Sequence, residues 1–201
     1  MENSINTLIP VVVTLIIGLS IGYYYGVGKS KIPETGMHMM PGGGMMKDAK
    51  MGGAADQHFI VEMIPHHQGA IDMAKVALER SKQPEILKLS NDIIAAQTKE
   101  INDMTAWYKN WYGTDVPPGG MGMHMGGMTG DLATLGQKSG SDFDKEFLTQ
   151  MIPHHEMAIM MAQMIRSSER AEMRQLAENI VTSQANEIQM MREWLASGFG
   201  N

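Results

Sequence analysis

The sequence predicts an all-α fold, a four-helix bundle built from two copies of one helical hairpin. Two observations support this prediction. The motif M-I-P-H-H occurs at residues 63–67 and again at residues 151–155. Around both copies, apolar residues recur every three or four positions, which is the spacing of one face of an α-helix. The same supersecondary unit is therefore expected twice in the chain.

The similarity between the two halves extends far beyond this motif. An offset of 88 aligns Asp56 with Asp144, Phe59 with Phe147 and Met63 with Met151, and an offset of 87 aligns Gln97, Glu100 and Met104 with Gln184, Glu187 and Met191. Each copy thus comprises two helices. Two such hairpins can bury their apolar faces against each other as a bundle.

The first 28 residues predict a membrane anchor. Residues 8–28 are uncharged and about long enough to cross a bilayer. A cleaved signal peptide is the alternative, although Glu2 stands where a basic residue is usual and no clear cleavage motif follows. Lys29 and Lys31 would favour a cytoplasmic domain by the positive-inside rule. The metal chemistry below favours export instead, so we expect a periplasmic or otherwise extracytoplasmic protein anchored by residues 8–28.

A tether and then the first hairpin are expected next. Residues 29–54 are rich in Gly, Met and Lys and cannot bury enough apolar surface to fold alone, which predicts a flexible linker. The helical domain should cover residues 55–197. Its first helix is expected from about Asp56 to Ser81. The second should run from Pro84, whose fixed φ suits a first turn, to about Tyr112, before Gly113.

A second Gly-, Pro- and Met-rich segment, residues 113–140, connects the two hairpins. It is long enough for a crossover of the kind found in ferritin-like bundles. The remaining boundaries are expected at Ser141 or Asp142 for the start of the third helix, at Ser167 or Ser168 between the third and fourth, and at Gly198 for the end of the fourth.

Composition limits the possible chemistry. The chain has no cysteine and 22 methionines, so soft-metal binding would depend on thioether sulfur. The absence of thiols suits an oxidising compartment. The net charge of -6 is spread without a basic cluster, which argues against nucleic acid as a partner.

The adjacent histidines of each motif must point in different directions, because neighbouring residues on a helix differ by about 100°. His67 falls in an apolar row that is expected to be core. His66 falls in a row with Met63, three residues before it and within ligand reach on the same face. The candidate metal ligands of the bundle are Met63, His66, His67, Met73, Met151, His154, His155, Met157 and Met161.

Methionine is also concentrated in the two segments expected to be flexible, where there is no core to fill. Both contain the same tripeptide, Met37-His38-Met39 and Met123-His124-Met125. Thioethers select Cu(I), and imidazole accepts Cu(I), Cu(II) and Zn(II), so this donor set predicts copper in both oxidation states, with silver and zinc as further candidates. Scavenging of oxidants by surface methionine is an alternative that does not require histidine.

With this repeated motif and these Met- and His-rich flanks, residues 55–197 resemble the bacterial CopM-like family. The resemblance implies a ferritin-like four-helix fold, periplasmic copper binding and copper tolerance. At the matching positions it points to Met63, His66, His67, Met151, His154 and His155 as metal ligands. Copper ions would be the main partner, with a copper exporter or a membrane sensor as further candidates.

Two other functions are compatible with a helical bundle. A di-iron oxidoreductase would need a Glu-x-x-His motif on two helices, and none is present. Glu100 and Glu187 recur at equivalent positions, but we interpret them as solvated or helix-pairing carboxylates. A purely structural bundle would leave the methionine-rich segments unexplained. We therefore expect metal binding without catalysis.

Overall fold

The computed structural model describes residues 49–118 and 131–198. These residues form four long helices, a short helix and a 3-10 turn: α1 (Ala49–Arg80), α2 (Pro84–Tyr112), α3 (Leu132–Gln137), α4 (Gly140–Ala162), η1 (Gln163–Ile165) and α5 (Ala171–Ala196). The described ranges contain no strand, and the predicted all-α class is confirmed. The chain divides into two compact units, Met1–Gly43 and Gly44–Asn201, and all of these helices belong to the second.

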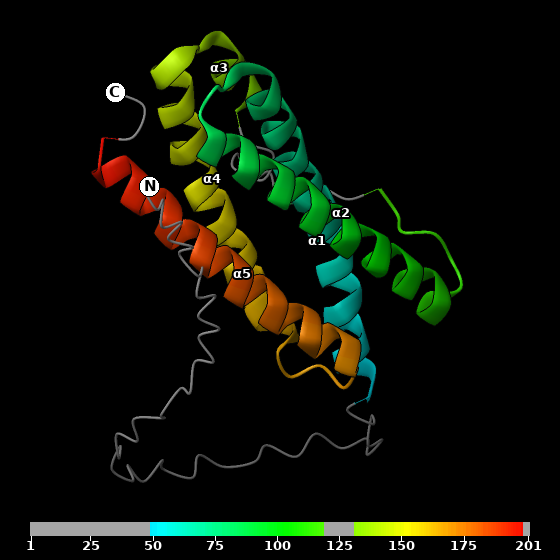
Figure 1. Ribbon diagram of the computed structural model, residues 1–201. Coiled ribbons are helices and arrows are strands. Elements are labelled where there is room, and N and C mark those ends of the chain that lie inside the picture. Colours follow the sequence, from blue (N-terminus) through cyan, green and yellow to red (C-terminus); the bar gives the residue numbers. More distant parts are fainter. Residues whose placement is uncertain (1–48, 119–130, 199–201) are drawn as a thin grey trace, which may run out of the picture. The chain divides into compact units, whose positions relative to one another are not determined.

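The four long helices form two antiparallel hairpins (Figure 1). α1 packs along α2, α4 packs along α5, and the hairpins meet mainly through α1 and α4. The end of α2 and the start of α4 lie at opposite ends of the bundle in Figure 1. The connection between them therefore spans the bundle length, as a ferritin-like crossover requires.

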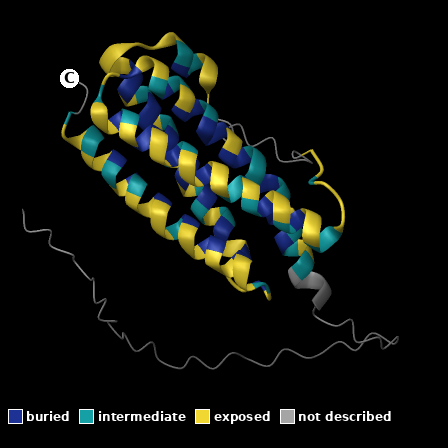
Figure 2. Ribbon diagram, turned by 45° about the vertical axis from the view of Figure 1, so that its right-hand side comes forward, coloured by how far each residue is buried: buried dark blue, intermediate teal, exposed yellow. Residues whose placement is uncertain are grey.

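The core consists of two clusters of buried residues, one toward each end of the bundle, and Figure 2 shows the buried residues on the inner faces of the helices. We call them the Phe147 cluster and the Phe59 cluster. The Phe147 cluster includes Ala70, Met73, Ile86, Leu89, Ile93, Phe143, Phe147, Met151, Ile188 and Met191. The Phe59 cluster includes Phe59, Ile60, Met63, Met104, Tyr108, Ala158, Ala162, Met173, Leu176 and Ile180. Each long helix contributes to both clusters.

Several helix boundaries differ from those expected. α1 begins at Ala49, within the predicted tether, and its added turns are anchored by the Tyr112 hydroxyl, which donates a hydrogen bond to the Gly53 carbonyl at 2.9 Å. α4 begins at Gly140 after Ser139, rather than at Ser141 or Asp142. α2 begins and ends as predicted, with Gly113 in the left-handed conformation at φ 72°.

The predicted flexible connection is partly helical, because α3 lies within residues 113–140. Asp131 caps this helix by accepting a hydrogen bond from the Thr134 backbone N–H at 2.9 Å. Leu135 is fully buried in the Phe147 cluster. One buried apolar side chain and one helix cap thus stabilise a short helix in a segment whose Gly-, Pro- and Met-rich composition does not predict one.

Pro65 and Pro153 both lie inside their helices, α1 and α4. An internal proline removes one backbone hydrogen bond and costs about 3 kcal/mol. Each proline comes immediately before the histidine pair. The backbone is thus locally weakened at the same level in both hairpins.

A buried ion pair connects the start of α1 to the turn before α5. Asp56 is buried, and its Oδ2 accepts hydrogen bonds from Arg170 Nη1 at 2.7 Å and from Ser168 Oγ at 2.9 Å. The Arg170 guanidinium also lies 4.4 Å from the ring centroid of Trp111 on α2. These contacts fix one end of the bundle.

None of the described helices is long and apolar enough to cross a membrane. The predicted anchor, almost all of the tether, and the tripeptides at residues 37–39 and 123–125 lie outside the described residues, so these expectations stay predictions.

Replacing Asp56 with Ala should lower the free energy of unfolding by about 2 to 4 kcal/mol, because Arg170 and Ser168 lose a buried partner. Urea denaturation followed by circular dichroism measures this difference. Asp115→Ala is the matched control, since Asp115 pairs with Lys109 at the exposed surface, and it should leave stability almost unchanged. Equal effects of the two substitutions would show that the Asp56 pair has no special role.

Candidate functional site: a buried histidine layer

Polar side chains from all four long helices meet at mid-length of the bundle. We call this group the histidine layer, and it comprises His66 and His67 from α1, Gln97 and Glu100 from α2, His154 and His155 from α4, and Gln184 and Glu187 from α5. Along each helix, these residues separate the side chains of the Phe59 cluster from those of the Phe147 cluster. The four histidines and two glutamines are buried.

His66 and His154 face each other across α1 and α4. Their ring centroids are 3.8 Å apart, and the ring planes are inclined at 42°. Burial, and then repulsion from His154 and the other histidines, lowers the pKa of His66 from 6.5 to about 2. His66 is therefore a neutral imidazole across the physiological pH range.

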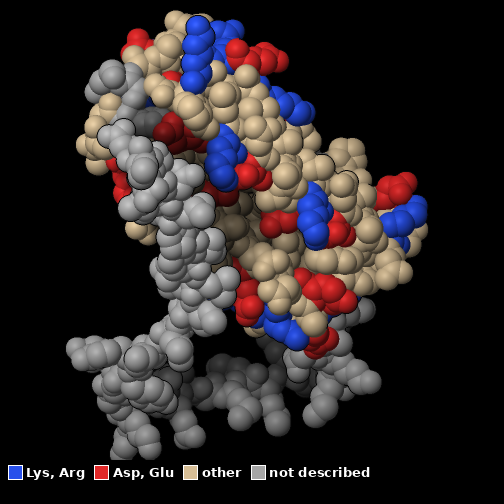
Figure 3. All heavy atoms as spheres, in the orientation of Figure 1, with Lys and Arg blue, Asp and Glu red and all other residues tan. Residues whose placement is uncertain are grey.

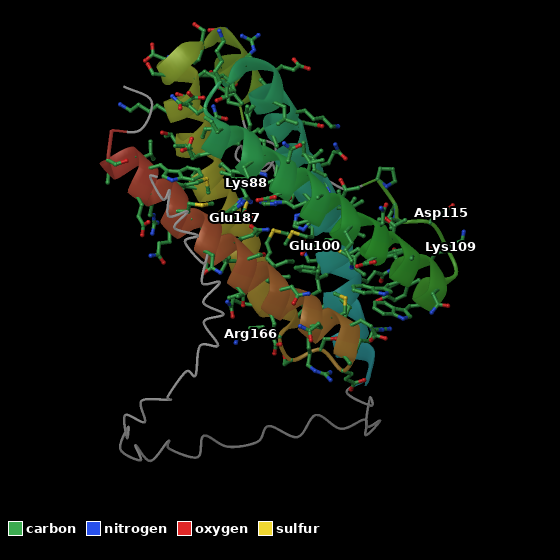
Figure 4. The ribbon with its side chains drawn as sticks, viewed as in Figure 1. Lys88, Glu100, Lys109, Asp115, Arg166 and Glu187 are labelled. Carbon is green, nitrogen blue, oxygen red and sulfur yellow. The ribbon has the colours of Figure 1, made fainter. Side chains whose placement is uncertain are left out.

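The second histidine of each motif is paired with a glutamate on the neighbouring helix. His67 Nε2 lies 2.6 Å from Glu100 Oε2, and His155 Nε2 lies 2.6 Å from Glu187 Oε2. Figure 4 shows the two glutamates at mid-length of the bundle, on α2 and α5. Of the two roles expected for Glu100 and Glu187, solvated or helix-pairing, the structure shows the second, because each one contacts a buried imidazole on the neighbouring helix and is itself only 15% or 19% exposed.

Several buried polar atoms of this layer lack hydrogen-bond partners among the described residues. They are both ring nitrogens of His66, Nδ1 of His67 and His155, and the Oε1 atoms of Gln97 and Gln184. A buried polar atom without a partner costs about 1 to 3 kcal/mol, and native proteins contain few of them. Such a concentration at one level is typical of a site that takes up a ligand.

Buried thioethers lie next to the layer on both sides. Met63 and Met151 come one helical turn before the histidine pairs, while Met104 and Met191 come one turn after the glutamates. All four are fully buried. Met104 and Met191 were absent from the predicted ligand set, although their recurrence at the same offset as the glutamates could have revealed them.

The remaining predicted ligands of the bundle are dispersed. Met73 is buried in the Phe147 cluster, whereas Met161 packs against the Phe59 cluster. Met157 is half-buried and belongs to neither. The His67 row of α1 is buried as expected for core, and His66 in the neighbouring row is fully buried as well.

A groove of about 620 Å³ between α2 and α5 reaches the edge of the layer. Glu100, Asp103, Trp107 and Glu172 are among its lining residues. Asp103 is paired with Lys99 at 2.6 Å, and positive and negative side chains are interspersed on the face shown in Figure 3. Glu100 is thus the residue that links this groove to the buried imidazole of His67.

The donor set fits a soft metal ion better than a hard one. The described residues contain no group of three or more His, Asp or Glu side chains placed to hold a metal ion. A di-metal carboxylate centre needs more such ligands on each metal. Neutral imidazoles beside buried thioethers are instead the donors preferred by Cu(I).

Residues 56–195 match the family model described as a domain of unknown function, DUF305. The chain belongs to the DUF305 family. The resemblance inferred from the repeated motif is thereby confirmed, and the matched region contains the whole histidine layer.

Solved DUF305-type structures agree with this fold. CopM in a Cu(II)-bound form is 43% identical, with a TM-score of 0.65, over 71% of this chain and 96% of CopM. CopM has also been solved with Cu(I) and with silver. A DUF305 protein of Streptomyces coelicolor, described as secreted, is 29% identical, with a TM-score of 0.64, over 72% of this chain and 93% of that protein.

A shorter match is to the uncharacterized protein L153 of Acanthamoeba polyphaga mimivirus, which is 45% identical over 51 residues. These residues are 25% of this chain, and the chain spans about a third of the viral protein, 34%. This match adds no information on function.

His66→Leu should change how the stability of the metal-free protein depends on pH. The unfolded chain binds a proton at His66 below pH 6.5, whereas the folded chain does so only near pH 2. The wild-type free energy of unfolding should therefore fall as pH drops below 6.5, and His66 should account for up to about 1.4 kcal/mol per pH unit of that fall. Urea denaturation at pH 6.5, 5.5 and 4.5 measures the slope, and equal slopes for the two proteins would contradict a neutral His66.

Proposed function

We propose that this DUF305 protein binds Cu(I) and Cu(II) through the histidine layer and its flanking methionines. The unpartnered nitrogen atoms of buried imidazoles, adjacent to buried thioether sulfurs, carry this proposal. An ion bound there would satisfy polar atoms that otherwise lack partners. The copper- and silver-bound structures of CopM, at 42–43% identity, support copper as the bound metal ion.

The two Met-His-Met tripeptides and the buried histidine layer have different expected roles. Met37-His38-Met39 and Met123-His124-Met125 would capture copper, because Gly-rich surroundings let their side chains reach an ion from solution. His66, His154, Met63 and Met151 would then hold the ion where water is excluded. Such transfer requires no chemical step, and the protein would sequester copper or pass it on.

An extracytoplasmic location suits this role. The absence of cysteine and the Streptomyces coelicolor relative described as secreted support it. The proposed physiological result is copper tolerance, with residues 8–28 as an anchor.

The proposal is tested by titrating the full chain with Cu(I) under anaerobic conditions against a chromophoric chelator, and with Cu(II) separately. His66→Leu with His154→Leu should remove the tightest binding, with a loss of at least tenfold in affinity, of the size seen when metal-site residues are removed. Leucine is chosen because it fills the buried space and brings no polar atom of its own into it.

Two further variants separate the sites. In the first variant, the four methionines of the two tripeptides are replaced with Leu, and His38 and His124 with Asn. This variant should lose the weakly bound copper ions and keep the tightly bound ones. Met160→Leu with Met164→Leu is the matched control, since both side chains are exposed, and it should bind as the wild type does. Unchanged copper binding after loss of His66 and His154 would refute the site, and a wild-type chain that binds neither ion would refute the function.

A further inference from the structure

We infer that Glu100 and Glu187 are positioning residues of the proposed copper site. Each carboxylate holds the Nε2 proton of its histidine and so presents the Nδ1 lone pair of His67 or His155 to the metal ion. This inference rests on the proposed function, because it names the donor atom and the residue that selects it.

The position of the first proton follows from the hydrogen bonds. A carboxylate only accepts, so the imidazole Nε2 at 2.6 Å must donate in both pairs. Hydrogen bonds to an ionised partner are short and are roughly twice as strong as neutral ones. Nε2 of each histidine is therefore occupied and cannot bind metal.

The position of the lone pair follows from burial. Nδ1 of His67 and of His155 is buried and has no hydrogen-bond partner in the described ranges. A proton at Nδ1 would be a buried donor without an acceptor, which is costly. Nδ1 is therefore the ring nitrogen whose lone pair is open to a metal ion.

Each glutamate and histidine pair is ordered from solvent to core as in known metal sites, with the carboxylate behind the imidazole. The glutamates are 15% and 19% exposed, while the two histidine side chains are 0% exposed. The carboxylate therefore lies on the solvent side and the imidazole on the inner side. Metal-binding histidines almost always donate their other ring N–H to a carboxylate, carbonyl or water, and loss of that partner typically weakens metal binding 10- to 100-fold.

The same His–Glu pair occurs in both hairpins of the duplicated fold. The same distance, the same atom pair and the same unpartnered Nδ1 occur in α1 with α2 and in α4 with α5. A chance surface ion pair would not recur with both imidazoles fully buried. A carboxylate required only for stability would not need Nδ1 to be free.

Two substitutions at each glutamate separate positioning from charge. Gln keeps an oxygen that accepts a hydrogen bond from Nε2–H. Leu removes this acceptor, so that either ring nitrogen can carry the proton. We expect Glu100→Leu and Glu187→Leu each to weaken Cu(I) binding at least tenfold, and Glu100→Gln and Glu187→Gln to stay within about threefold of the wild type. Glu172→Leu is the matched control, because Glu172 lines the same groove without pairing to a buried histidine.

The second measurement does not depend on copper. The ¹⁵N spectrum of imidazole-labelled, metal-free protein should show that His67 and His155 carry a proton at Nε2 and none at Nδ1. Rings protonated at Nδ1 would overturn the inference, even in a protein that binds copper. Leu variants that remain folded by circular dichroism and bind Cu(I) as the wild type does would overturn it as well.

A wild-type chain that fails to bind copper would instead refute the proposed function, and the spectrum would still decide the proton positions. If a Leu variant does not fold, the Gln variants and the wild-type spectrum provide the decision.

Discussion

The burial of four imidazoles at one level of a helical bundle is the constraint on which this structure depends. The His66 and His154 rings lie next to each other with their planes tilted, and His67 and His155 each contact a carboxylate. Four such rings cannot all carry charge in a low-dielectric core, and the pKa of His66 is lowered to about 2 by burial and by its neighbours. Buried ring nitrogens need partners, and the described residues leave several of them unpaired.

The surrounding fold offsets the energetic cost of burying this polar layer. The Phe147 and Phe59 clusters lie on either side and provide the apolar burial that offsets the unpaired polar atoms. The Asp56–Arg170 pair fixes one end of the bundle. Because the hairpin is duplicated, α1 and α4 supply equivalent histidines and α2 and α5 equivalent glutamates, so two similar donor sets face one another.

Much of this arrangement could be predicted from the sequence. Periodicity and the internal repeat predicted the four long helices, and Pro84 and Gly113 defined the limits of α2. The pairing of Glu100 with His67 could not be predicted, because it joins residues 33 positions apart on different helices, and a lone glutamate is usually solvated. The burial of both His66 and His67 follows from the packing of α1 against α2 on one side and α4 on another. α3 was missed because its order depends on the burial of Leu135.

The most direct test of the central claim is X-ray absorption at the copper edge on Cu(I)-loaded protein in which residues 37–39 and 123–125 have been replaced. The account predicts a first shell that contains both imidazole nitrogen and thioether sulfur, with the nitrogen contribution reduced after His66→Leu and His154→Leu. A shell of sulfur alone, or one that is unchanged by those two substitutions, would contradict it.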